Sequence, residues 1–105
     1  MSRKPLTHDM LRVVAHRFKV LAEPARLEVL NALRGGPLNV SELIDETGLN
    51  QANLSKHLQV LHATGFVTRR REGLFVIYQL ADARVSQLCD HMCGQVKRHA
   101  ASQAR

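Results

Sequence analysis

The chain has 105 residues, a net charge of +6 with neutral histidines, and two cysteines. This length fits one domain or one protomer of a small oligomer, and two cysteines are too few for a disulfide framework. No apolar run approaches the roughly 20 residues of a membrane-spanning helix, and residues 1–10 resemble no signal peptide. We therefore expect a cytoplasmic protein without a membrane segment, and the basic excess favours a polyanionic partner.

The amino-terminal third of the chain predicts two amphipathic helices. Between residues 8 and 23, apolar side chains recur at helical spacing, beginning with Leu11, Val14 and Phe18. A second helix begins at Pro24, since proline is favoured at a first helical position, and a Gly-Gly-Pro run ends it.

Residues 40–64 predict a helix-turn-helix. Asn39 followed by Glu42 has the spacing of a capping box, which would begin a first short helix. Gly48 suits the end of that helix, and Asn50 can cap the next one. Two short helices joined by a tight turn that contains glycine are typical of this motif.

Residues 66–80 predict a β-hairpin, here called the wing. Two β-prone runs are joined through Arg-Glu-Gly, with Gly73 available for the turn. A last helix is expected over residues 82–100, with Asp82 as its cap. The apolar stripe of that helix consists of Val85, Leu88, Met92 and Val96.

Together these elements predict a mostly α fold with a β-hairpin. We expect residues 1–105 to form a single winged helix-turn-helix domain of about five helices and a two-stranded wing, in the order α-α-α-α-β-β-α. The helices at 8–23 and 82–100 carry more apolar surface than so small a core can cover, which predicts a homodimer built on them. A two-fold dimer would hold its reading helices about one turn of DNA, roughly 34 Å, apart.

The second helix of the helix-turn-helix has an unusual polar face. Behind an apolar stripe of Leu54, Leu58 and Leu61, the outward positions carry short neutral groups and one cation. Because base edges in the major groove are neutral donors and acceptors, we predict that these residues contact DNA. They are Gln51, Ala52, Asn53, Ser55, Lys56 and Gln59. The other interpretation is a solvated helix that lacks acids, and His57, beside the stripe, is expected to be packed and hydrogen-bonded.

Arg69, Arg70 and Arg71 are predicted at the tip of the wing, where they would contact phosphates or the neighbouring minor groove. Because successive strand residues point to opposite faces, about two of the three arginines would face the DNA. The other interpretation of the run is a solvated hairpin tip.

The segment from Leu21 to Leu80 resembles the ArsR/SmtB family of bacterial winged-helix transcriptional repressors. The likeness is carried by LSKHLQVL followed by GFVTRRREG. It implies a homodimer that binds a double-stranded DNA operator with two-fold symmetry and is released by an inducer. Two other functions stay open: a thiol enzyme, and a winged-helix protein-interaction module without DNA binding. We expect no enzyme, because the sequence has no C-x-x-C motif, glycine-rich phosphate loop or acid–base dyad.

The chain departs from two metal sites of that family. Where metal-sensing members resemble ELCVCDL, this sequence has PLNVSEL, with Asn39 and Ser41 in place of thiolates. The family's site on the last helix has the form Asp-x-His followed after ten residues by His-x-x-Glu or His. After Asp82, arginine and glutamine occupy the remaining positions of that pattern.

Cys89 and Cys93 are the remaining sensor candidates. Four residues apart, they share one helix face at the edge of the apolar stripe, in or beside the expected dimer interface. A disulfide within one helix would be strained, so pairing with the partner subunit is easier. Two pairs could offer up to four thiolates to a soft metal or metalloid inducer such as arsenite. Three roles stay open: inert packing, soft-metal or metalloid sensing, and thiol redox or sulfur-species sensing. No other cofactor is expected.

Overall fold

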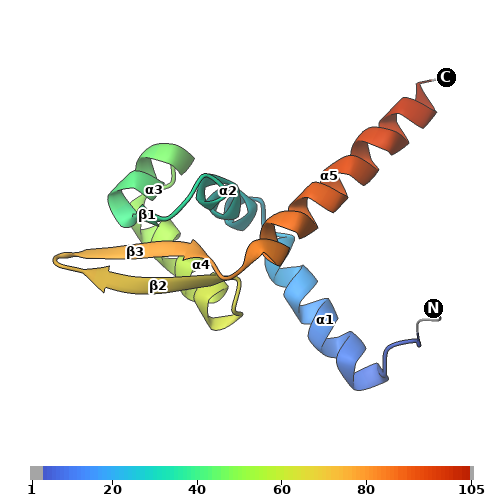
Figure 1. Cartoon of the computed structure of the whole chain (residues 1–105), viewed down its shortest axis with the longest axis horizontal. Helices are drawn as coiled ribbons and strands as arrows, with labels where there is room; N and C mark the ends of the chain where they lie inside the picture. The colour runs from blue at the N-terminus through green and yellow to red at the C-terminus, as the bar shows by residue number, and fades with distance from the viewer. Residues whose placement is uncertain (1–3, 105) are drawn as a thin grey trace.

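Within residues 4–104, which the computed structural model describes, the chain forms five helices and three short strands (Figure 1). The elements are α1 (His8–Leu21), α2 (Pro24–Leu33), β1 (Leu38–Asn39), α3 (Val40–Thr47), α4 (Gln51–Ala63), β2 (Val67–Glu72), β3 (Phe75–Leu80) and α5 (Ala83–Gln103). This arrangement confirms the expected fold class, a mostly helical winged helix-turn-helix. One strand, β1, was not predicted.

The capping residues predicted from the sequence set the ends of α3 and α4. The Asn39 side chain accepts a hydrogen bond from the Glu42 backbone N–H at 2.8 Å, and the Glu42 carboxylate accepts one from the Asn39 N–H at 2.9 Å. Gly48 ends α3 in the left-handed conformation, with φ of 74°. Asn50 then begins α4 by accepting from the Asn53 N–H at 2.8 Å. Local sequence therefore defines the turn between the two helices.

The wing belongs to a three-stranded antiparallel sheet in the order β1-β3-β2, rather than to an isolated hairpin. Leu38 of β1 pairs with Tyr78 of β3, on the edge of β3 that β2 leaves free. The predicted order lacked this strand because two residues are too short to show the period-2 pattern of a strand. The hairpin turn falls at Gly73–Leu74, and the φ of 60° at Gly73 is one that glycine adopts without strain.

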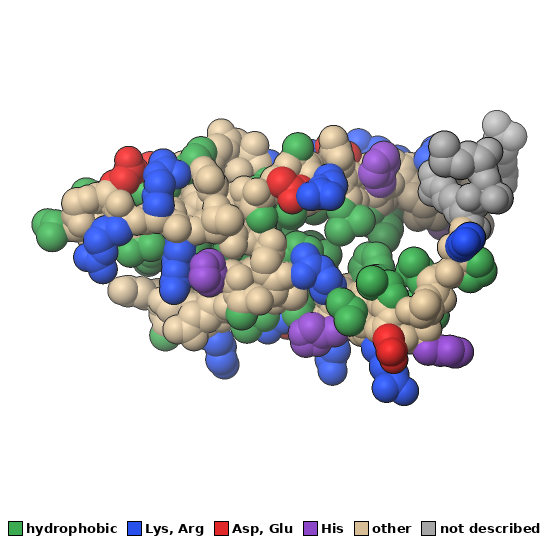
Figure 2. Space-filling model, turned by 60° about the horizontal axis from the view of Figure 1, so that its bottom comes forward, with side chains coloured by type: hydrophobic (Ala, Val, Ile, Leu, Met, Phe, Trp, Pro, Cys, Tyr) green, Lys and Arg blue, Asp and Glu red, His purple; other side chains and the backbone are tan. Residues whose placement is uncertain are grey.

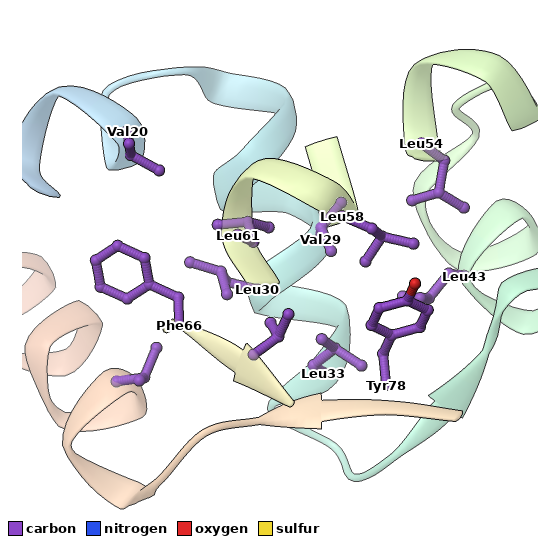
Figure 3. Close-up of a cluster of buried hydrophobic side chains, with 12 residues drawn as sticks. Val20, Val29, Leu30, Leu33, Leu43, Leu54, Leu58, Leu61, Phe66 and Tyr78 are labelled. Atoms are coloured by element: carbon purple, nitrogen blue, oxygen red, sulfur yellow. The ribbon is translucent and has the colours of Figure 1, made fainter. Parts of the chain in front are cut away.

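The leucine stripe of α4 forms the centre of the core (Figure 3). Leu54, Leu58 and Leu61 are each at most 1% exposed. They gather with side chains of α2 and with Tyr78 of β3. Burying one leucine contributes on the order of 1.5–3 kcal/mol to folding. One side of α4 is thus fixed to the body of the protein, and its opposite side faces outward.

Helices α1 and α5 lie largely outside this core. In α5, Val85 is buried, but from residue 90 onward the helix projects away from the body (Figure 1). Its amino end is capped by Asp82, and the hydrogen bond from the Arg84 guanidinium lowers the pKa of the Asp82 carboxyl. None of the helices in the described chain is long and apolar enough to span a bilayer. Exposed apolar side chains on the two helices include Leu11, Phe18, Met92 and Val96.

Candidate nucleic-acid interface

The outward side of α4 presents neutral hydrogen-bonding groups to solvent. All six residues predicted to contact DNA are exposed, namely Gln51, Ala52, Asn53, Ser55, Lys56 and Gln59. No carboxylate occurs between Gln51 and Ala63. The leucines on the other side fix the backbone of α4, so this face keeps its position relative to the rest of the protein. The face therefore offers amides, a hydroxyl, a methyl group and one ammonium, with no negative charge to repel phosphate.

His57 joins α4 to the amino end of α2. The residue is half-buried, and its Nδ1 accepts a hydrogen bond from Arg26 Nε at 3.3 Å. A second N–H of Arg26 donates to the backbone oxygen of Val20 at 3.3 Å. The prediction of a packed and hydrogen-bonded histidine is confirmed. Arg26 thereby links α1, α2 and α4, which helps to fix the orientation of the exposed α4 face.

The arginine run of the wing lies along β2 rather than at its tip, which corrects the predicted placement. Arg69 pairs with Tyr78 and Arg71 with Val76 across the sheet. The wing prediction ended the first strand at residue 70, because it placed the remaining polar residues in the turn. Strand pairing instead continues to Glu72.

The three arginines divide between the two faces of the wing. Arg69 and Arg71 share the face of Tyr78, whose side chain is buried in the helical core. Arg70 lies on the other face, where its guanidinium donates to Gln79 Oε1 at 3.2 Å and lies 3.5 Å from a Glu72 carboxylate oxygen. Two arginines therefore point to the α4 side of the wing, and one is engaged on the opposite side.

A second basic surface, which was not predicted from the sequence, lies between α1 and the carboxyl end of α4. It is a groove of about 800 Å³. Its lining consists of Arg12, Val13, His16, Arg17, Lys19, Val20, Arg26, Val60, Ala63 and Thr64. The available signal was the four- and three-residue spacing of Arg12, His16 and Lys19, which places them on one side of α1. Figure 2 shows Lys and Arg side chains at the wing end, on the left, and along the lower edge toward the right.

The two cysteines remain free thiols on α5. Cys89 is half-buried and Cys93 is exposed. Asp90, next to Cys89, forms an ion pair with Arg34 at the carboxyl end of α2. Among the described residues, no three His, Cys, Asp or Glu side chains are grouped so that they could hold a metal ion. A site that uses both thiols and further ligands would therefore need groups from outside residues 4–104 of one chain.

The buried leucine stripe, the exposed polar helix and the adjoining basic hairpin define a winged helix-turn-helix protein. Residues 23–69 match the sequence profile described as "Bacterial regulatory protein, arsR family". The chain is 40% identical to the HTH-type transcriptional regulator NmtR of Mycobacterium tuberculosis over 86 residues, which are 82% of this chain and 72% of that protein. This chain therefore belongs to the ArsR family of bacterial regulatory proteins.

Two further similarities extend the comparison. A protein named "Probable mercury resistance operon repressor", from Streptomyces lividans, is 34% identical over 80% of this chain and 66% of its own length. The solution structure of the homodimeric winged helix-turn-helix DNA-binding domain of Mb0332 from Mycobacterium bovis has a TM-score of 0.80. It shares 30% identity and covers 94% of this chain and 92% of that domain. The resemblance to the ArsR/SmtB family is thus confirmed, and it extends through the flanking helices.

Proposed function

We propose that this chain is a sequence-specific DNA-binding repressor that acts as a cytoplasmic homodimer and leaves its operator when an inducer binds. The observation that carries the proposal is the exposed, acid-free face of α4 with three fully buried leucines behind it. A helix held in this way can enter a major groove and offer hydrogen bonds to base edges. The residues proposed to contact DNA are Gln51, Ala52, Asn53, Ser55, Lys56, Gln59, Arg69 and Arg71. Arg70, which was also predicted to contact DNA, is engaged with Gln79 and Glu72 on the other face of the wing and is left out of this set.

The proposed dimer rests on the uncovered apolar side chains of α1 and α5. Phe18 is 51% exposed, and Met92 and Val96 are each 56% exposed. Large apolar side chains grouped on two helices are typical of an interface with another molecule. We propose that the whole chain acts as one winged helix-turn-helix domain, with residues 8–23 and 82–100 as its dimerisation helices. The Mb0332 domain, which is described as homodimeric, supports this assembly.

For the inducer, we propose Cys89 and Cys93 as the sensor thiols. Cys89 is half-buried and Cys93 is exposed in a single chain, and both lie on the proposed dimerisation helix, so thiols of two subunits could meet there. One chain offers two thiolates and no third grouped ligand within residues 4–104, so a soft metal or metalloid that needs three or four thiolates would have to be bound between two subunits. The name of the Streptomyces lividans relative supports a thiophilic metal. The alternative chemistry is oxidation of one thiol from each subunit by a peroxide, which forms a disulfide between subunits while the peroxide is reduced to water or an alcohol.

Operator binding is the direct test. Purified protein should bind a duplex from upstream of its own gene more tightly than a random duplex, with an affinity that falls steeply as salt rises. Sedimentation should give the mass of two chains for the free protein and of two chains plus one duplex for the complex. A monomer with no preference for any duplex would contradict the proposal and favour a protein-interaction module.

A further inference from the structure

The groove between α1 and α4 has a strongly asymmetric charge. Five of the residues that line it are basic, and none of its lining residues within the described part of the chain carries a carboxylate. Its floor is partly apolar, through Val13, Val20, Val60 and Ala63. The basic side chains stand on α1 and at the start of α2, whereas the facing wall belongs to α4. The groove is thus an anion-attracting surface next to the helix proposed to read DNA.

Two of the basic groups are engaged within the protein. Arg17 donates a hydrogen bond to the Thr64 backbone oxygen and lies 4.4 Å from the centroid of the Phe66 ring. Arg26 is bonded to His57 and to Val20. These contacts connect α1 and α2 to α4 across the groove. The remaining basic groups are available to bind a partner molecule.

Three basic side chains of the groove have no such engagement. Arg12, His16 and Lys19 are exposed, and none of them takes part in a side-chain hydrogen bond or ion pair among the described residues. Arg12 and Lys19 are cations. Spaced by one helical turn, or about 5 Å, the three side chains suit a partner with repeated negative charges better than a single small anion.

The groove directly adjoins the exposed face of α4. Ala63, which lines it, continues the helical series Ala52, Lys56 and Gln59 at spacings of four, three and four residues. The wing extends to one side of α4, and α1 extends to the other (Figure 1). A helix in a major groove has a sugar–phosphate backbone along each side. If the wing reaches one of these backbones, the basic residues of α1 lie on the side of the other.

We propose that Arg12, His16 and Lys19 bind phosphates of the DNA backbone that borders the reading helix on the side away from the wing. This inference rests on the proposed function and adds to it a second, sequence-independent contact surface. The wing and α1 would then each bind one of the two backbones that border the major groove. These contacts would position α4 against the base edges from both sides.

A charge-matched pair of variants tests the proposal. Arg12→Gln with Lys19→Gln removes two cations from the groove, and Lys97→Gln with Arg98→Gln removes two from the exposed, projecting part of α5. If each groove cation neutralises one phosphate in each subunit, the first variant should lower the slope of log affinity against log salt by about 3 to 4. Because α5 is also a proposed dimerisation helix, sedimentation first checks that the α5 variant is still a dimer. That variant should leave the slope close to that of the wild type. Equal effects of the two variants, or no effect of the first, would overturn the proposal.

Two further measurements separate contact from folding and from ligand binding. The swap Arg12→Lys with Lys19→Arg keeps both cations and should give the salt slope of the wild type. In phosphate-ethylation interference, the Arg12→Gln, Lys19→Gln variant alone should lose the interfering phosphates on the backbone away from the wing. A groove variant that binds DNA normally but no longer responds to inducer would assign the groove to a small anion and overturn the proposal. Wild-type protein that binds no operator at all would instead contradict the proposed function.

Discussion

The division of the wing arginines predicts that they contribute unequally to DNA binding. Arg69 and Arg71 lie on the face that packs toward α4, whereas Arg70 is engaged with Gln79 and Glu72 on the other face. We therefore expect Arg69→Ala with Arg71→Ala to weaken binding to every duplex, and Arg70→Ala to do so much less. The second change removes a surface ion pair, which contributes at most about 1 kcal/mol to stability.

The size of the effect depends on how many phosphates the arginines neutralise. One phosphate for each of two arginines in each subunit gives four phosphates in a dimer. At about 0.9 per phosphate, the double variant should lower the slope of log affinity against log salt by about 3.6. Between about 50 and 200 mM salt, the affinity of the variant should then fall about a hundredfold less than that of the wild type.

Fluorescence anisotropy with a labelled operator and a random duplex measures both slopes, and thermal melting checks that the variants fold. Both duplexes should lose affinity alike, because phosphate contacts carry no sequence information. An Arg70→Ala variant that lowers the slope as much as the double variant would refute the assignment of faces. A double variant with an unchanged slope would show that the wing does not touch DNA.

Further substitutions test the reading helix and the thiols. Asn50→Ala removes the cap of α4 and should lower the free energy of unfolding by about 0.5–2 kcal/mol in denaturant titrations, whereas Asn50→Asp should be nearly neutral. Gln51→Ala or Ser55→Ala should reduce the difference in binding free energy between operator and random duplex by about 1–3 kcal/mol for each base that the variant no longer contacts. An unchanged difference would remove that residue from the proposed DNA-binding set. Cys89→Ser with Cys93→Ser should stay on the operator under arsenite, a thiophilic metal or peroxide; release as in the wild type would assign the cysteines to packing.

The helical part of the fold was predictable because its signals are local. The capping box at Asn39, the left-handed Gly48 and the cap at Asn50 each depend on residues a few positions apart. The leucine stripe of α4 likewise needs only helical periodicity, and it correctly identified the buried side of that helix. From these features the sequence also predicted which side chains α4 exposes.

The remaining features depend on partners that are distant in the sequence. Strand β1 exists because Leu38 meets Tyr78, forty residues along the chain. Arg71 lies in a strand because Val76 pairs with it, although a run of charged residues favours a turn. The basic groove forms where α1 passes the end of α4, and no pattern within α1 alone indicates that neighbour.

The projection of α5 from its own subunit affects how a signal could reach the DNA. From residue 90 to residue 103 the helix is exposed except for half-buried Gly94, so in a dimer its direction would be set mainly by the partner. With 21 residues, α5 is about 31 Å long, and a tilt of only about 5° at its root displaces its far end by about 2.7 Å. The Arg34–Asp90 ion pair ties the root of this helix to α2, and Arg26 ties α2 to α4. A small change in the angle of α5 near the thiols would thus change the separation of the two reading helices by ångströms. With that separation changed, the two helices would no longer fit both half-sites of the operator at once.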